Sequence, residues 1–134
     1  MKKLGIIFFQ INSTNFLKRM SKLQIDEFQQ LIVEALENVK AQDIKIFNTK
    51  AKSDFFDRVI IASGVSTTQT KALARSVVEK VKQKSEFIYG VEGLENGEWV
   101  LIDCGDIICH VMHPSIREYY CLEEIWGNKS VGTD

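Results

Sequence analysis

Two carboxylates, a thiol and an imidazole lie close together in an otherwise apolar part of the chain, and these groups could do chemistry. Asp103 and Asp106 flank Cys104 and Gly105, and His110 follows four residues later. Paired carboxylates can hold Mg²⁺ for phosphoryl transfer, whereas thiols and imidazoles can hold Zn²⁺. The same side chains could also form a docking surface for another protein. The three alternatives predict three different functions.

The spacing of the two nearest thiols argues against zinc. If Cys104 and Gly105 form the two-residue turn of a hairpin, Gly105 takes a positive φ. Cys109 then lies along the second strand, roughly 15 Å from Cys104, and faces another direction. Two thiols so placed cannot share one metal ion, so we predict no metal site. Cys109 is expected to act as a small buried apolar side chain.

Catalysis by Asp103 and Asp106 is the alternative function. The two acids would repel each other unless one takes up a proton or a Mg²⁺ ion bridges them. The sequence has no P-loop lysine and no nucleophile elbow, and Gly64 is a single glycine before a helix, not a glycine-rich phosphate loop. Acids beside a glycine are also ordinary turn chemistry. We therefore predict no enzyme and no cofactor, with a Mg²⁺-dependent nucleotidyltransferase-like reaction as the alternative.

A hairpin in this register gives two faces of different composition. It places Asp103 opposite Asp106 and Trp99 opposite His110, and side chains alternate between the two faces. One face is wholly apolar and should be core: Val100, Ile102, Ile107, Cys109 and Val111. The other face mixes apolar, acidic and imidazole groups: Trp99, Leu101, Asp103, Asp106, Ile108 and His110. That composition suits a partly exposed contact surface, so Trp99→Ala or Asp103→Lys should weaken partner binding while the fold survives.

The hydrophobic pattern predicts the elements that must position this hairpin. The expected helices cover 24–40, about 67–84 and 114–126, and the expected strands cover 43–48, 57–62, 87–91, 98–102 and 106–112. Ser66 and Gln69 form a capping box before the second helix, Pro114 suits the first turn of the third, and Gly127 the position beyond its end. In the third helix, Tyr119, Leu122 and Trp126 form one stripe, while Ile116 and Tyr120 form another. The order α-β-β-α-β-β-β-α indicates an α/β domain with a mixed sheet of about five strands.

One domain accounts for most of the 134 residues, of which 45% are hydrophobic. We expect it to span 21–127, with a tail over 128–134. Residues 1–20 carry four basic side chains, no acid and the apolar run LGIIFF, and we take them as an extension or the result of an upstream start. No apolar run approaches the roughly 18 residues of a membrane span. Three cysteines indicate a reducing compartment, so we expect a cytoplasmic protein.

The second half of the chain is strongly acidic. Between Glu86 and Glu124, nine acids face Arg117 as the one basic residue. A surface of this sign repels phosphate backbones and attracts basic proteins. We therefore expect no direct nucleic-acid specificity, no membrane partner, and a basic protein as partner.

Five blocks in order make the chain resemble the Iojap/RsfS family of ribosomal silencing factors, over roughly residues 23–126. They are KAQDI from Lys40, DRVIIASGVS from Asp57, GVEG from Gly90, WVLIDCGDIICHVM from Trp99 and REYYCLEEIW from Arg117. The resemblance implies an α/β fold related to nucleotidyltransferases, with no established enzymatic role. It also implies binding to protein fourteen of the large ribosomal subunit, where the factor blocks the small subunit when nutrients are scarce. Several members form homodimers, so a self-association surface is expected too.

The partner-binding candidates follow from the hairpin face together with the resemblance. Glu92, Asp103 and Asp106 would meet basic side chains, and His110 would be a polar aromatic contact. Trp99, Leu101 and Tyr119 would be anchors, and Gly105 completes the set as the turn glycine.

Overall fold

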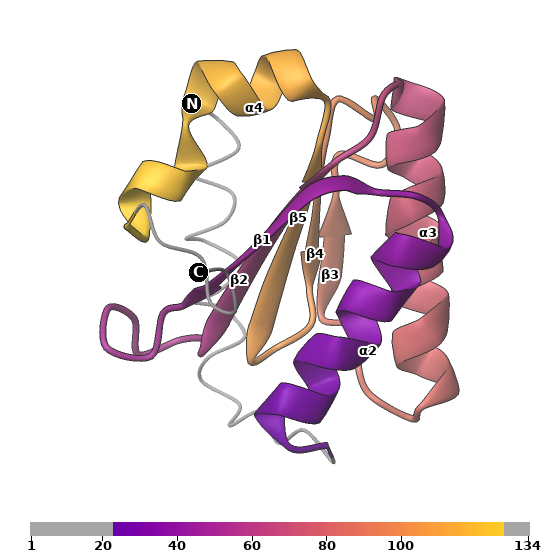
Figure 1. Cartoon of the computed structure of the whole chain (residues 1–134). Helices are drawn as coiled ribbons and strands as arrows, with labels where there is room; N and C mark the ends of the chain where they lie inside the picture. Colours follow the sequence, from indigo (N-terminus) through magenta and orange to yellow (C-terminus); the bar gives the residue numbers. More distant parts are fainter. Residues whose placement is uncertain (1–22, 128–134) are drawn as a thin grey trace.

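The computed structural model describes residues 23–127 as a three-layer α/β fold around one mixed sheet. The extension expected over 1–20 and the tail over 128–134 lie outside the described residues. The helices are α2 (Ile25–Asn38), α3 (Thr67–Gln83), α4 (Pro114–Tyr120) and the 3₁₀ helix η1 (Leu122–Ile125). The strands are β1 (Gln42–Asn48), β2 (Arg58–Ser63), β3 (Gly90–Glu92), β4 (Trp99–Asp103) and β5 (Ile107–Met112). The predicted fold class, with five strands in a mixed sheet, is confirmed (Figure 1).

The sheet has the order β1-β2-β5-β4-β3, so strands distant in sequence meet at its centre. β2 and β5 pair in parallel, with Arg58 opposite Ile107 and Ser63 opposite Met112. All other neighbouring pairs are antiparallel. From Val59 to its end, β2 is buried at every position, as its continuous apolar run predicts for a strand covered on both faces.

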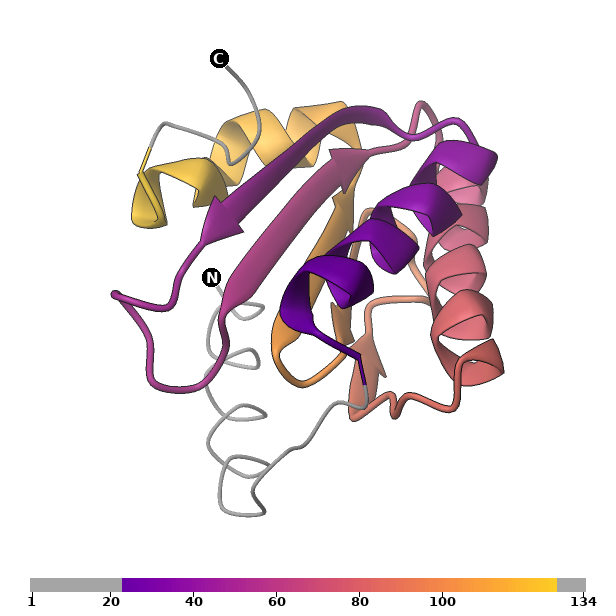
Figure 2. The same cartoon turned by 60° about the horizontal axis from the view of Figure 1, so that its bottom comes forward.

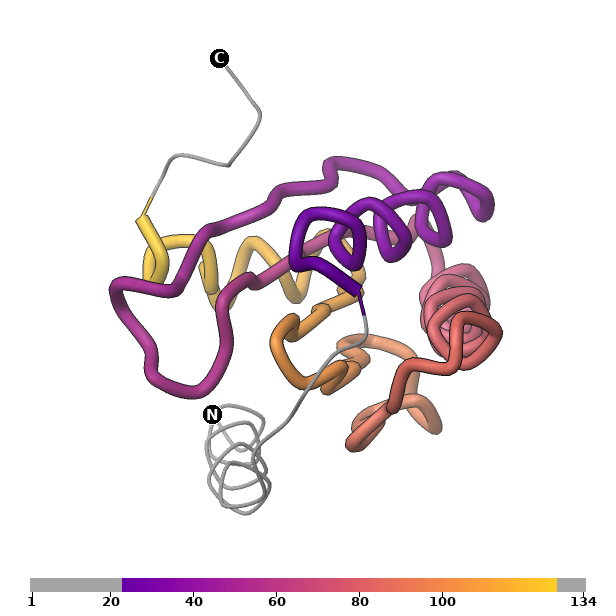
Figure 3. The backbone as a smooth tube through the Cα atoms, turned by 90° about the horizontal axis from the view of Figure 1, so that it is seen from below, coloured from indigo at the N-terminus to yellow at the C-terminus, as the bar shows by residue number. Residues whose placement is uncertain are grey.

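The two faces of the sheet are covered by different layers. α2 and α3 pack side by side on the first face, as Figure 2 shows. α4 and η1 lie on the opposite side (Figure 3). The first core cluster includes Phe28, Ile32, Leu36, Ile60, Leu73, Val77, Val100 and Ile102. The second contains Phe47, Phe56, Val59, Ile61, Trp99, Leu101, Ile108, Met112 and Leu122.

The N-terminus of α3 is capped by the predicted residues, with one difference. The Ser66 hydroxyl accepts a hydrogen bond from the Gln69 backbone N–H at 3.1 Å. In a capping box the Gln69 side chain would return to the Ser66 N–H, but its Oε1 accepts from the Val65 N–H instead. Gln69 Nε2 also donates to the Val39 carbonyl at 2.9 Å. Gln69 therefore ties the start of α3 to the residue that ends α2.

Two predicted elements differ from the structure. The strand expected over 87–91 is β3, which begins only at Gly90, because Phe87 remains 66% exposed and the chain first joins β4 through the Tyr89 N–H, which bonds to the Asp103 carbonyl. The single closing helix is in fact two, since Cys121 takes a left-handed conformation with φ 50°. Leu122 and Trp126 consequently pack in the second cluster with Ile116 and Tyr120, whereas Tyr119 points to solvent. Along residues 23–127, none of the helices combines the length and apolar character that crossing a bilayer requires.

Candidate partner-binding surface

The turn between β4 and β5 is built by Asp103 and Gly105. The Asp103 carboxylate accepts a hydrogen bond from the Gly105 N–H at 2.9 Å, and Gly105 has φ 91°, the positive value predicted. The Cys104 N–H bonds to the Ile107 carbonyl at 3.0 Å, so the two-residue turn is Gly105–Asp106, one residue later than the predicted Cys104–Gly105. Asp103 therefore lies opposite Ile108, and the prediction that it faces Asp106 is wrong.

The changed register leaves the two predicted faces intact. Trp99 lies opposite Met112 instead of His110, a shift of two residues. Because side chains alternate with period two, an even shift keeps each side chain on its predicted face. The face predicted as core is confirmed, since its five members all lie in the first core cluster: Val100, Ile102, Ile107, Cys109 and Val111.

Both hairpin thiols are buried in this first cluster. The predicted turn made Cys104 and Cys109 face different directions. In the structure both side chains pack in the same cluster. Burial raises the pKa of the Cys109 thiol from 9.0 to about 12. Burial also raises the pKa of Cys104 well above its ordinary value, with smaller contributions from Cys109 and Asp103. The two buried thiols thus stay protonated and unreactive at neutral pH, while Cys121 is exposed.

The second face of the hairpin is buried, so the expectation of a partly exposed contact surface is wrong. Trp99 is 5% exposed, Leu101 1%, Asp103 1% and His110 3%. The physical reason is the break in the closing helix, which lets side chains from α4, η1 and the loop before β2 pack over this face. Those that join the second cluster are Phe55, Phe56, Ile116, Tyr120, Leu122 and Trp126.

An aromatic series links this buried face to the surface. The Trp99 indole N–H donates to Nδ1 of His110 at 3.0 Å. Since an indole nitrogen only donates, Nδ1 accepts and His110 is neutral with its proton on Nε2. The rings of Trp99 and Tyr120 are 5.1 Å apart, and those of Tyr120 and Tyr119 are 5.0 Å apart. Tyr119 is 79% exposed, so it is the predicted aromatic that a partner can reach.

The acidic candidates also divide into buried and accessible residues. Asp103 is committed to the turn, whereas Glu92 and Asp106 are half-buried at the surface. The Asp106 carbonyl accepts hydrogen bonds from the N–H groups of Asp57 and Arg58 at 2.8 and 3.1 Å, which fixes the turn against the start of β2. The predicted site residues left out four exposed acids in this half of the chain, which the charge count alone could have suggested: Glu95, Glu98, Glu118 and Glu124.

The structure thus separates the predicted site residues into two groups. Those within reach of a partner are Glu92, Asp106 and Tyr119. Those buried beneath the surface are Trp99, Leu101, Asp103, Gly105 and His110. Within residues 23–127, no three His, Cys, Asp or Glu side chains are grouped so that they could hold a metal ion. The hydrogen bond that the Gly105 N–H donates to the Asp103 carboxylate is the ordinary turn chemistry given above as the alternative to a catalytic role.

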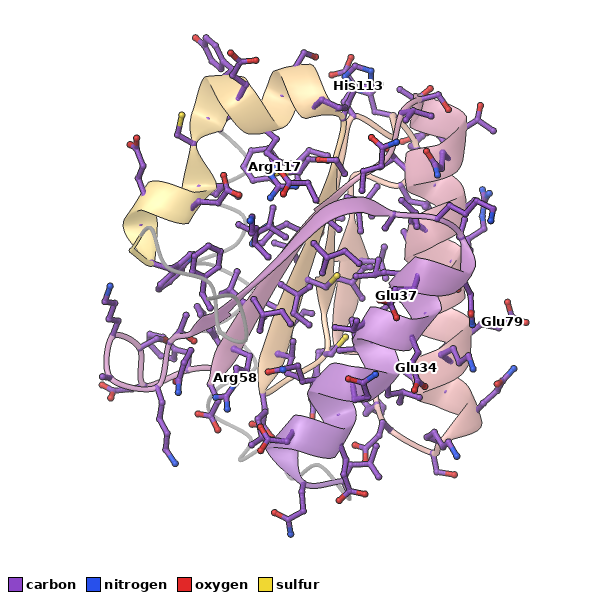
Figure 4. All side chains as sticks on the ribbon, in the orientation of Figure 1. Glu34, Glu37, Arg58, Glu79, His113 and Arg117 are labelled. Carbon is purple, nitrogen blue, oxygen red and sulfur yellow. The ribbon has the colours of Figure 1, made fainter. Side chains whose placement is uncertain are left out.

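Arg117 holds α4 and η1 to the sheet, a role that the sequence prediction missed. It is 6% exposed, and its guanidinium donates to the Asp43 carbonyl at 2.7 Å and to the Ser63 hydroxyl at 2.9 Å. It also donates to the Glu123 carboxylate through Nε at 3.2 Å. In Figure 4 its side chain points from α4 toward the strands. Arg117 is the one basic residue between Glu86 and Glu124. This isolation among acids is a sequence signal from which its role could have been predicted.

Comparison with known proteins gives the same family for nearly the whole described chain. Residues 22–134 match the family model for the ribosomal silencing factor during starvation, RsfS. A ribosomal silencing factor RsfS from Chromobacterium violaceum is 46% identical, over 80% of this chain and 88% of its own. A mouse protein named mitochondrial assembly of ribosomal large subunit protein 1 is 29% identical, over 82% of this chain and 48% of its own.

The fold comparison agrees with the sequence comparison. A crystal structure of a Chromobacterium violaceum protein superposes with a TM-score of 0.79 and 45% identity, over 81% of this chain and 90% of that chain. The resemblance read from five sequence blocks is therefore confirmed, and the chain belongs to the RsfS family of ribosomal silencing factors.

Proposed function

We propose that this chain binds the large ribosomal subunit through its protein fourteen and thereby blocks the joining of the small subunit. The observation that carries the proposal is the family match over residues 22–134. The name of the mouse relative, which concerns assembly of the large ribosomal subunit, supports the same subunit as the partner. In this proposal the chain works in the cytoplasm, covers the surface of the large subunit that the small subunit would contact, and catalyses no reaction. It thereby represses translation when nutrients are scarce.

The charge of the exposed surface supports a basic protein partner. Four acids are exposed and Glu92 is half-buried; the exposed ones are Glu95, Glu98, Glu118 and Glu124. Acidic side chains around a docking surface steer a basic partner toward it and select its orientation. They also repel the phosphates of ribosomal RNA, so the chain would contact the subunit through protein.

Tyr119 is our candidate for the anchor of this interaction. Tyrosine is enriched among the residues that dominate interface energies, because its ring buries a large area at a small entropic cost. Its ring packs edge-on against Tyr120, which in turn contacts the buried Trp99. Trp99 and His110 therefore serve the interaction by positioning: they support the layer on which Tyr119 sits, without touching the partner.

Sedimentation with purified ribosomal subunits tests the proposal. The full chain should pellet with large subunits and not with small ones, and adding it before mixing should reduce the fraction of joined ribosomes on a sucrose gradient. Sedimentation of the free chain alone measures the self-association that the family resemblance implies. Joining at an unchanged level, with the large subunits saturated by the chain, would reject the blocking mechanism.

A further inference from the structure

A shallow apolar groove lies between α3 and the edge strand β3. Its volume is about 350 Å³, and its lining is mainly aliphatic with one charge of each sign: Ala74, Arg75, Val78, Glu79, Val91 and Leu94. Among the described residues the sheet ends at β3, which pairs with β4 on one side. Phe87, in the connection from α3 to β3, is 66% exposed. A strand edge beside exposed apolar surface is a place where another chain can pack.

Two opposite charges on the rim of this groove are left without a partner. Arg75 and Glu79 lie one turn apart on α3, and both are exposed. They could pair with each other along the helix, but within the described part of the chain neither side chain forms an ion pair. The cations of the described ion pairs are instead Lys45, Arg58 and Arg117. Glu79 points outward from α3 in Figure 4, so this pair of charges is available to a partner that covers the groove.

The charges around the groove are of both signs. The bases are on α3 and the acids are on α3 and in or after β3: Lys71, Arg75 and Lys82 against Glu79, Glu92 and Glu95. A strongly acidic or strongly basic partner would be repelled by half of these groups. A surface that carries both signs can be complementary to its own copy, because a two-fold axis sets each group opposite a different one.

We propose that a second copy of this chain packs on the α3–β3 edge about a two-fold axis, with the two α3 helices antiparallel and Arg75 of each copy opposite Glu79 of the other. Two equivalent ion pairs then flank the axis. Apolar side chains from both copies, Val78 and Leu94 among them, fill the joined grooves. The family resemblance implies self-association without a location, and this proposal assigns the face and the contacts.

The other bases on the groove side of α3 do not meet each other in this arrangement. In an antiparallel pair of helices, residues whose numbers add to the same total as 75 and 79 face each other. Lys71 of one copy therefore lies opposite Gln83 of the other, and Lys82 lies opposite Ala72. The register that pairs the opposite charges thus brings no like charges together along the two helices.

Lys80 is directed away from the groove. It follows Ser76 by one helical turn, and residues one turn apart share a face of the helix. The Ser76 hydroxyl donates to the Ala35 carbonyl of α2 at 2.8 Å. Lys80 therefore lies on the side of α3 that faces α2, outside the proposed contact.

Charge reversal in the full chain tests the proposal. Arg75→Glu leaves acids at both positions of each copy, and Glu79→Arg leaves bases at both, so each single variant should raise the dissociation constant of the dimer at least about tenfold. An equimolar mixture of the two variants should form dimers again. The double variant, Arg75→Glu with Glu79→Arg, should return to within about threefold of the unchanged chain, because the two changes compensate each other. Sedimentation equilibrium measures each constant.

Matched variants control for net charge. Glu37→Arg on α2 and Lys50→Glu after β1 make the same charge changes at exposed positions outside the groove, and both should associate like the unchanged chain. Single variants at 75 and 79 that dimerise as tightly as the unchanged chain, or controls weakened as much as they are, would overturn the proposal. A chain that stays monomeric at the highest concentration measured would overturn it too. Circular dichroism of each protein controls for the fold.

Discussion

The indole N–H of Trp99 and Nδ1 of His110 form a buried hydrogen bond of 3.0 Å that joins β4 to β5 on the second face of the sheet. Both residues are at most 5% exposed. Since a buried acceptor that loses its donor also loses the compensation for its desolvation, this bond fixes which side chain can occupy position 99.

Trp99→Phe should keep an aromatic ring in contact with Tyr120 but remove the indole donor from His110. We expect the free energy of unfolding in urea to fall by about 1–3 kcal/mol. Trp126→Phe is the matched control, because Trp126 is only half-buried and its contact with Phe56 is between rings. A loss as large at position 126 would mean that ring size, and not the hydrogen bond, matters at position 99.

Arg117→Ala should destabilise the chain by about 3 kcal/mol, because it leaves a carboxylate and a buried hydroxyl without their cationic partner. The groups affected are those of Glu123 and Ser63. The exposed Arg75→Ala should stay within about 0.5 kcal/mol of the unchanged protein. Thermal unfolding of both variants measures the difference, and equal midpoints would contradict the role assigned to Arg117.

Tyr119→Ala should weaken binding to large ribosomal subunits by about tenfold, which corresponds to about 1.4 kcal/mol. Because Tyr119 is 79% exposed, its removal should leave the unfolding free energy nearly unchanged. Full binding by the folded variant would remove Tyr119 from the proposed interface.

Glu118→Lys should slow association with large subunits, most visibly at low salt, because it reverses one charge on the acidic surface. Glu37→Lys makes the same change on α2, in the opposite layer (Figure 4), and should leave the rate close to its original value. Stopped-flow association at two salt concentrations separates the cases. Equal slowing by both variants would indicate a net-charge effect and no defined surface.

The buried thiols should make the fold sensitive to alkali. Burial raises the pKa of Cys109 from 9.0 to about 12 and that of Cys104 in the same direction. Between pH 9.0 and 12 the folded state therefore binds more protons than the unfolded state, so stability is fully present below pH 9.0 and falls as the pH rises. The fall should approach about 1.4 kcal/mol per pH unit for each thiol.

Urea unfolding between pH 8 and pH 11 measures this slope. Cys104→Ala with Cys109→Ala should flatten it, although the double variant is less stable at every pH because it leaves cavities. An equally steep slope in the double variant would assign the alkali sensitivity to lysines and tyrosines.

The sequence predicted the fold where periodicity decides it and failed where a single backbone conformation decides it. α2, α3, β2, β4 and β5 lie within one or two residues of their predicted bounds. The break at Cys121 was not predictable from pattern, because cysteine has no special preference for φ 50°. That one residue redirects Leu122 and Trp126 onto the sheet, and it accounts for the failure to predict that Trp99 and His110 are covered.

The site was predicted by residue type but not by accessibility. Trp99 looked like an interface anchor because aromatic and acidic residues alternate around it. Because Trp99 is only 5% exposed, we expect Trp99→Ala to lower the free energy of unfolding by about 3–5 kcal/mol. Tyr119→Ala is therefore the cleaner test of binding. Burial of a mixed face depends on what packs over it, which a single strand pattern cannot specify.

The parallel pairing of β2 with β5 has a consequence for how the chain acquires its structure. Residue 58 lies beside residue 107, so the two central strands are joined by a long crossover, and closing it costs chain entropy before any contact compensates. α2, β1, β2 and α3 can exist only as an unfinished assembly until the last third of the chain has been synthesised. We therefore expect a late, concerted folding step, in which the hairpin inserts and the sheet centre, both layers and the Tyr119 surface form together.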